Sequence, residues 1–276
     1  MNLRGSCLGA GWYYRNPAEV KRFLSEFAAA HNPAACAAIA PHAGWFYSGK
    51  IAARVIAALD RNIDTIAIIG GHLGGGAQPM FALEDAVDSP LGYMEIDAEL
   101  RSAVFREIDG EEDRFPDNTV EVLVPMARFF FPGAKLLWMR FPAAPASFEA
   151  GKTLAEAAEK LGRKIAVVAS TDLTHYGKNF NFTPRGGGIN ALRWMREVND
   201  RGFIDAVISG NPAAVLERAK TDQSSCSAGA VLGALGFASA RGAGSARFVE
   251  YATSADAEDS EEPPASFVGY ASFVFE

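Results

Sequence analysis

Three of the four histidines each follow a short apolar run, and imidazoles at such positions could bind a metal or transfer a proton. They are His42 after residues 35–40, His72 after residues 65–70, and His175 after residues 164–170. A neutral imidazole is a common metal ligand and also exchanges protons near neutral pH. The fourth histidine, His31, follows a predicted helix, and we expect it to cap that helix or to lie on the surface.

Two other side chains could complete such a site. Cys226 stands in SSCSAG, directly before an apolar stretch predicted to be helical, and a helix N-terminus lowers the pKa of a thiol. Asp172 precedes His175 by three residues and could orient its ring. Two imidazoles and one anionic ligand leave open coordination positions, which suits a catalytic transition metal.

Each of these residues also has a purely structural interpretation. His42 could hydrogen-bond to backbone in the tight turn of PHAGWFYSG, and the glycines of GGHLGGG could serve only to permit positive φ. Asp172 could cap a turn, and Cys226 could be an inert small hydrophobe. Taken alone, the structural interpretation of His42 is the stronger one. The repetition of the same position three times favours a functional site.

Several common motifs are absent from the sequence. It contains no G-x-S-x-G nucleophile elbow, no P-loop, no H-E-x-x-H and no C-x-x-C pair. Its glycine runs do not match G-x-G-x-x-G. The scattered histidines, acids and cysteine therefore remain as the candidate site.

The segments between these residues predict alternating strands and helices. Apolar runs at residues 35–40, 65–70, 134–139 and 164–170 are typical of buried strands, and helical patterns separate them. This alternation predicts an α/β fold, a three-layer αβα sandwich around a mostly parallel or mixed central sheet. Ligands of open α/β sheets bind beyond the carboxyl ends of strands, which is where the three histidines fall.

The remaining elements follow from capping residues and periodicity. We predict helices at residues 16–30, 49–59, 97–106, 117–130, 147–161, 189–208, 212–218 and 228–238. We predict further strands at residues 80–87, 247–253 and 267–275. The acidic stretches 109–113 and 256–262 are expected to be solvated loops, and Pro125 is expected to kink its helix. No linker divides the chain, so we expect one domain, residues 1–276.

The composition excludes some classes of partner. A net charge of -7 and a pI near 5.3 argue against nucleic acid and against an anionic membrane surface. No apolar run approaches the roughly 18 residues that span a bilayer. The first residues lack the pattern of a signal peptide. Three cysteines are too few for a disulfide framework, which favours a reducing, cytoplasmic location.

Motifs over nearly the whole chain resemble those of the Memo family, whose bacterial and archaeal form is called AmmeMemoRadiSam system protein B. AGWYYRNPAEVKRFL looks like that family's A-G-S-W/F-Y opening, and PHAGWFYSG matches P-H-A-G-Y-x-Y-S/C-G. IAIIGGH stands where the family has an apolar strand ending in G-P-S/N-H-H. STDLTHYG matches S-S-D-L/F-S/C-H-Y/W-G, SSCSAGAVLGAL stands at the family's C-G motif, and SFVGYASFVF resembles its closing strand.

The resemblance implies a metal centre and a fold similar to class III extradiol dioxygenases, which use non-haem iron(II). It implies that His42, His72 and Cys226 hold the metal, with iron and copper both proposed for the family. A thiolate in place of a carboxylate favours copper(I) or zinc more than the dioxygenase site does. The expected cofactor is therefore iron or copper, with zinc as an alternative.

The resemblance also assigns residues around the metal. Asp172 and His175 would line the pocket as acid–base residues, and Glu121 matches an acidic residue of the family. Trp45 and Tyr47 would form the pocket wall. Asn118 stands where many members have the histidine of E-H-S-x-E, so one pocket histidine is replaced.

Two further departures concern the ligands themselves. The family's double histidine is the single His72 here, and Ser227 rather than glycine follows Cys226.

Three functions are compatible with these residues. They are a redox-active, dioxygenase-like metal enzyme with an unknown small-molecule substrate, a non-catalytic adaptor that binds a ligand or peptide, and a metal-assisted hydrolase. The resemblance also implies a functional link to a radical-SAM protein, and oligomers are compatible with it.

Overall fold

Four parallel strands form the centre of the larger sheet, and they are the strands that the apolar runs predict. They lie side by side in the order β2 (Ala37–Ala40), β9 (Ile165–Ser170), β3 (Thr65–Gly70) and β8 (Lys135–Arg140). Their residues are buried on both faces apart from the first residues of β9 and β8, as parallel strands between helices require. The computed structural model describes residues 1–258 and 264–276.

Antiparallel pairs extend this sheet at both edges. On one side, β2 pairs with β12 (Ser266–Phe275), which also pairs with β10 (His175–Gly177) and β11 (Arg247–Thr253). On the other side, β8 pairs antiparallel with β4 (Met80–Phe81), and β4 pairs in parallel with β7 (Glu111–Glu112). A separate small sheet joins β1 (Leu3–Arg4), β5 (Ala86–Val87) and β6 (Met94–Glu95).

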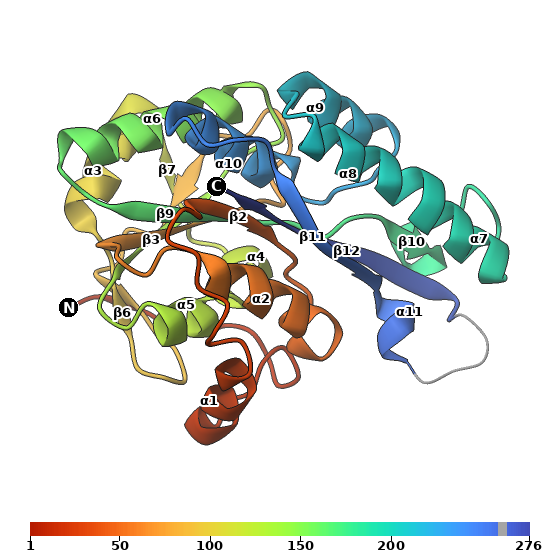
Figure 1. Cartoon of the computed structure of the whole chain (residues 1–276), viewed down its shortest axis with the longest axis horizontal. Coiled ribbons are helices and arrows are strands. Elements are labelled where there is room, and N and C mark those ends of the chain that lie inside the picture. The colour runs from red at the N-terminus through yellow and green to blue at the C-terminus, as the bar shows by residue number, and fades with distance from the viewer. Residues whose placement is uncertain (259–263) are drawn as a thin grey trace.

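Helices cover both faces of the sheet (Figure 1). One face packs against α3 (Ala98–Glu107), α6 (Ala146–Lys160), α8 (Arg201–Ile208), α9 (Pro212–Thr221) and α10 (Ala228–Ala240). The other packs against α1 (Pro17–Ser25), α2 (Lys50–Ala58), α4 (Asn118–Glu121) and α5 (Val124–Phe130). Neighbouring strand residues alternate between the two cores, as Ile68 and Ile69 do. The predicted αβα sandwich around a mixed sheet is confirmed.

Short helical segments complete the chain. They are the π-helical η1 (Trp45–Gly49) and η3 (Met195–Asp200), the 3₁₀ helix η2 (Lys178–Phe180), and the helices α7 (Gly188–Trp194) and α11 (Ser254–Ala257). Among the described residues, no helix combines the length and apolar character needed to cross a bilayer.

Helices α6 and α10 approach each other so closely that only glycine fits at their contact. A Cβ at Gly151 would overlap the Gly233 carbonyl, and a Cβ at Gly236 would overlap the Phe148 carbonyl. The obstacles are backbone atoms, so they cannot rotate away. This contact matters for the site because α10 begins two residues after Cys226.

Three predicted elements are wrong in detail. The single strand at residues 80–87 is two short strands, β4 and β5, in different sheets. The helix at residues 117–130 ends at Glu121 and restarts at Val124, with Pro125 in the first turn of α5, where its missing N–H costs no hydrogen bond. The acidic stretch 109–113 is not fully solvated: it contains β7, and Asp113 is completely buried.

Other boundaries also differ. Helix α1 ends at Ser25 rather than near residue 30, and the helix predicted at residues 189–208 contains the π-helical turn η3. Strand β10 was not predicted, because three residues give no periodic pattern. The second acidic stretch, residues 256–262, lies outside the described residues from position 259 onward.

Candidate metal centre

Three strand ends bring the predicted site residues together. Strands β2, β9 and β3 are parallel neighbours, so their carboxyl ends reach the same edge of the sheet. His42 and His72 each stand two residues after their strand, and Asp172 stands two residues after β9. The chain reaches the same place a fourth time in the loop before α10, which contains Cys226.

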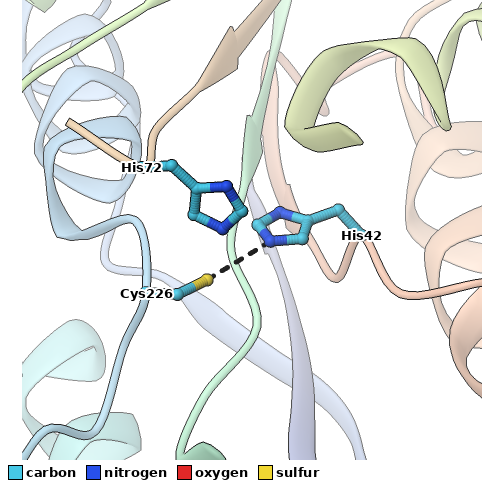
Figure 2. A group of neighbouring side chains, drawn as sticks. All are labelled: His42, His72 and Cys226. Atoms are coloured by element: carbon cyan, nitrogen blue, oxygen red, sulfur yellow. Dashed lines mark hydrogen bonds between the residues drawn. The ribbon is translucent and has the colours of Figure 1, made fainter. Parts of the chain in front are cut away.

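His42, His72 and Cys226 form one cluster. Figure 2 shows their side chains pointing toward one another from three different segments. The His42 Nε2 lies 3.2 Å from the Cys226 sulfur, and the two imidazole ring centres are 5.0 Å apart with nearly perpendicular planes. One ligand atom from each residue lies within 4.8 Å of the others, so the cluster could hold a metal ion.

Buried polar groups fix the orientation of His42. The Ser170 hydroxyl lies 2.9 Å from its Nδ1, and the Asp172 carboxylate accepts its backbone N–H at 2.8 Å. With Nδ1 occupied, Nε2 is the nitrogen that faces Cys226. Burial of His42 lowers its pKa, but the charges of Asp172 and Cys226 outweigh this effect and raise it above the ordinary value.

His72 is oriented by a residue that the sequence did not suggest. Its Nδ1 lies 3.1 Å from a carboxylate oxygen of Asp117, and Arg140 holds the same carboxylate at 2.9 Å. Burial opposes protonation, but the hydrogen bond to Asp117 raises the pKa of His72 to about 10. A carboxylate behind the ring fixes the tautomer and leaves Nε2 as the ligand atom.

The backbone of His72 itself is strained. It adopts φ of 58°, a left-handed conformation that side chains other than glycine rarely occupy. None of the glycines of GGHLGGG has positive φ, so the structural interpretation that they serve to permit it does not hold. Gly70 and Gly71 instead allow close packing, because a Cβ at either would overlap Thr119 or Ser227.

Cys226 lies among hydrogen-bond donors. The Asp172 backbone N–H donates to its sulfur at 3.3 Å, and its own N–H donates to the Asp172 carbonyl at 3.2 Å. Burial opposes ionisation of the thiol, but His42, His72 and His175 outweigh it and hold the pKa of Cys226 well below its ordinary value. A lowered pKa favours the thiolate, the form in which cysteine binds metals.

The donor set fits a first-row transition metal. A metal about 2.0–2.3 Å from nitrogen and sulfur ligands holds them roughly 3–4 Å apart, so small side-chain rotations would complete the site. Two imidazoles and one thiolate form a softer set than the two histidines and one carboxylate of non-haem iron enzymes. Three protein ligands leave coordination positions open.

A cavity of about 520 Å³ adjoins this cluster, with His42 and His72 in its lining. Its other walls are largely aromatic and apolar, and they include Trp12, Tyr47, Phe180, Phe267 and Tyr270. A volume of this size suits a small molecule.

His175 and Asp172 both line this cavity, but they are not bonded to each other as the sequence suggested. The His175 Nδ1 lies 3.1 Å from the Leu173 carbonyl, which assigns the proton to Nδ1. Asp172 is fully buried, and its carboxylate faces His42 instead. Burial raises the pKa of Asp172 despite the opposing charge of His42.

The predicted pocket residues divide into two groups. Tyr47 and Asn118 line the cavity, and the Asn118 amide donates to the His42 carbonyl at 3.1 Å. Trp45 does not line it, because its indole is buried in the core, stacks on Phe23 and donates to the Val122 carbonyl. Trp12 and Tyr270 were missed, since nothing in their local sequence indicates a pocket.

Glu121 lies apart from the histidine and cysteine cluster. Its carboxylate is buried and accepts hydrogen bonds from Ser6, Cys7, Leu8 and Tyr13 of the N-terminal segment. The catalytic role that the sequence suggested for Glu121 stays a prediction, and every hydrogen bond of this carboxylate comes from residues 6–13.

A second buried carboxylate supports the loop that contains Asp172 and His175. Asp200, at the end of η3, accepts hydrogen bonds from the backbone N–H and the hydroxyl of Thr174 and, at 2.7 Å, from the Tyr251 hydroxyl. Burial raises the pKa of Asp200 to about 6 in spite of these donors. The π-helical turn thus places a titratable group directly beneath the site loop.

This group gives stability a specific pH dependence. The folded state binds the Asp200 proton more tightly than the unfolded chain, so the contribution of Asp200 to the free energy of unfolding falls as the pH rises from about 4 to about 6. Asp200→Asn lacks this titration. We expect the unfolding free energy of the variant minus that of the wild type to rise by roughly 2–3 kcal/mol between pH 4 and pH 7. Urea unfolding at four pH values measures it, and parallel curves would contradict it.

A family model and the sequences of curated relatives indicate one family. A family model described as Memo-like protein matches residues 4–274. A MEMO1 family protein of Methanothermobacter thermautotrophicus is 30% identical over an alignment of 292 positions, which covers 98% of this chain and 99% of that protein. A MEMO1 family protein of Pyrobaculum arsenaticum is 30% identical over 249 residues, which cover 86% and 82%. An uncharacterized protein of Escherichia coli K12 with a solved structure gives a TM-score of 0.40 at 13% identity, covering 86% of this chain and 98% of that chain.

Proposed function

Because the chain belongs to the Memo-like family, we propose that it is a metal-dependent redox enzyme that acts on a small molecule. The observation that supports this most directly is the convergence of two oriented imidazoles and a thiolate beside a cavity. His42, His72 and Cys226 would hold the metal. A bound iron or copper ion would supply one-electron redox chemistry at that end of the cavity.

The surrounding residues would bind and orient the substrate. Trp12, Tyr47 and Tyr270 offer aromatic surfaces, and Asn118 offers an amide. The carbonyl of Leu173 keeps the His175 proton on Nδ1, so Nε2 can accept a proton from a ligand in the cavity. His175 would therefore be the acid–base residue, and Asp172 would hold His42 in place.

A metal-assisted hydrolase is the second candidate, and the donor set favours it. Zinc is commonly bound by histidine and cysteine, and its catalytic sites use three protein ligands with one open position. In that case the same three residues would bind zinc, and His175 would accept the proton of the attacking water.

Metal content and oxygen uptake separate these functions. We expect protein purified without oxygen, or reconstituted, to contain one iron or copper ion per chain and to consume O₂ with a suitable reductant such as a catechol. Hydrolysis with zinc and without O₂ uptake would favour the hydrolase. If neither iron, copper nor zinc binds stoichiometrically after reconstitution, both enzymatic proposals fail, and a ligand-binding adaptor becomes the better account.

The carboxylate behind His72 predicts a measurable loss of affinity. Asp117→Asn removes the charge that fixes the His72 ring, and we expect metal affinity to fall about 10- to 100-fold. Competition titration with Co²⁺ or Zn²⁺ measures the change. Asp222→Asn, which removes a surface carboxylate paired with Arg218, should leave the affinity unchanged. Equal affinities in the wild type and Asp117→Asn would show that the Asp117 carboxylate does not support metal binding through His72.

A further inference from the structure

The N-terminal loop, residues 6–15, forms one wall of the cavity beside the metal centre. Ala10, Gly11 and Trp12 line that cavity. Ala10 and Gly11 also line a second cavity of about 370 Å³, which Tyr14 and Phe46 border. Residues 10 and 11, which we call the partition, therefore separate the two cavities.

One buried carboxylate holds both ends of this partition. The Glu121 oxygens accept the Cys7 and Leu8 backbone N–H groups at 2.9 and 3.1 Å, before the partition. They accept the Tyr13 hydroxyl at 2.9 Å, after it. The Ser6 hydroxyl donates at 2.7 Å, and the Cys7 thiol donates to the same carboxylate. Five donors thus converge on a side chain that is only 3% exposed.

An arginine closes the loop from its other side. Arg15 donates to the Ser6 hydroxyl at 2.7 Å, to the Tyr13 hydroxyl at 2.8 Å and to the Leu8 carbonyl. Its guanidinium lies over the Tyr13 ring, 4.3 Å from the ring centre. Residues 6 and 15 are thereby held together, and the partition is the tip of a closed loop.

The tip of the loop contacts the segment that follows His42. The Trp12 carbonyl accepts the Trp45 backbone N–H at 2.8 Å, and a Cβ on Gly44 would lie 3.2 Å from the Gly11 carbonyl. Gly11 has φ of 96°, which glycine adopts readily. The loop is therefore held by Glu121 and Arg15 at its base and by the Trp45 N–H at its tip.

We propose that Glu121 is a positioning residue that holds residues 6–15 as the wall of the ligand cavity, and that this wall sets which ligands reach the metal centre. The proposal deepens the proposed function, on which it depends for the identity of the cavity as the ligand site. Compact ligands would fit with the wall in place. Loss of the wall would join the two cavities and admit bulkier ones.

Cys226 provides a probe of access, because its sulfur lies 3.2 Å from the Nε2 of His42 and clusters with His72, and both histidines line the cavity. Metal-free protein would be treated with iodoacetamide, which is small, and with fluorescein maleimide, which is bulky, and labelling of Cys226 would be followed by peptide mass spectrometry. In Glu121→Gln an NH₂ group replaces one carboxylate oxygen, and it cannot accept the hydrogen bonds that the backbone N–H groups of Cys7 and Leu8 donate in the wild type. We expect bulky labelling to accelerate by about tenfold or more, and small-reagent labelling by less than about threefold.

Amide hydrogen exchange separates a positioning role from general destabilisation. In Glu121→Gln we expect faster exchange at Leu8 and at Trp45, whose N–H bonds to the loop tip, with unchanged exchange in β3 and β9.

Asp97→Asn is the matched control, because Asp97 is equally buried and accepts a backbone N–H and a hydroxyl far from the cavity. It should not change Cys226 labelling. Trp12→Ala should accelerate bulky labelling while Leu8 exchange stays slow.

Two results would overturn the proposal: equal acceleration with both reagents in Glu121→Gln, or no acceleration at all in a variant whose Leu8 amide exchanges faster. Metal affinity, measured in parallel, should stay within about threefold of the wild type, since Glu121 touches none of the three ligands. Failure of the wild type to bind metal would defeat the proposed function, whereas the labelling results would still decide whether Glu121 holds the cavity wall.

Discussion

Cys226→Ser is expected to abolish stoichiometric metal binding, with a loss of affinity of roughly a thousandfold or more. The variant preserves the shape of the side chain but replaces a thiolate with a hydroxyl that stays protonated. The remaining imidazoles of His42 and His72 would then face a metal without an anionic ligand. Co²⁺ titration measures this directly, because a thiolate ligand gives a charge-transfer band in the near ultraviolet that a serine cannot give.

The chain offers a matched control for this experiment. Cys7 is an exposed residue whose sulfur is partly buried, and this burial, with the hydrogen bond to Glu121 and its charge, raises the pKa of Cys7 to about 11, which favours the protonated thiol. Cys7→Ser should leave both the affinity and the charge-transfer band unchanged. A band that persists in Cys226→Ser and disappears in Cys7→Ser would mean that the ligand assignment is wrong.

Gly236→Ala is expected to reduce the free energy of unfolding by about 3 kcal/mol or more, the largest stability effect of one added methyl group that we predict. The new Cβ would overlap the Phe148 carbonyl, so α6 and α10 would have to separate. Since α10 begins two residues after Cys226, metal affinity should fall as well. Urea unfolding of the metal-free protein gives the first quantity, and Zn²⁺ titration gives the second.

Gly202→Ala makes the same chemical change in a helix with the opposite expected sign. A Cβ there would meet only the Arg218 side chain, at an ordinary 3.5 Å, and Gly202 does not have positive φ. Alanine should therefore be neutral or stabilise the protein by up to about 1 kcal/mol through its helix propensity. If both variants lose similar stability, close helix packing is not the reason.

The sequence sufficed to locate the candidate site because the central strands are short, apolar and followed at once by reactive side chains. Parallel strands place such residues at one sheet edge whatever the rest of the chain does. The predicted helix start made Cys226 a candidate, but its assignment as a ligand together with His42 and His72 needed a resemblance to a known family, since a cysteine before an apolar helix has no distinctive local pattern. The contact between the Cys226 sulfur and His42 Nε2 joins residues that are 184 positions apart, so only the folded structure shows it.

The supporting residues could not be predicted in the same way. Asp117 and Ser170 act on the histidines across strands, and their own neighbours in sequence suggest a helix cap and a strand end. Glu121 stands in a motif that matches the family, yet its carboxylate turns toward the N-terminal loop. Trp45 follows a site histidine, but the π-helical turn directs its indole into the core and leaves Tyr47 at the cavity.

The errors in the fold have a common physical cause. Short strands such as β4, β5 and β10 exist because a neighbouring strand supplies their hydrogen bonds, and residues 80–87 contain no local signal for the change of sheet. Asp113 was expected in water, yet it is buried where the Trp138 indole donates to it and Arg4 and Arg140 pair with it. In each case residues distant in sequence determine the local structure or burial, so the local sequence pattern does not predict it.

The wide separation of the three clustered residues along the chain has a consequence for how the protein is made. His42 and Cys226 are 184 residues apart, and they meet only after β2, β9 and β3 have paired and α10 has docked. During synthesis, both histidines emerge from the ribosome long before the cysteine does. A complete set of these ligands therefore requires the folded sheet with α10 in place, and a chain that ends before Cys226 lacks it.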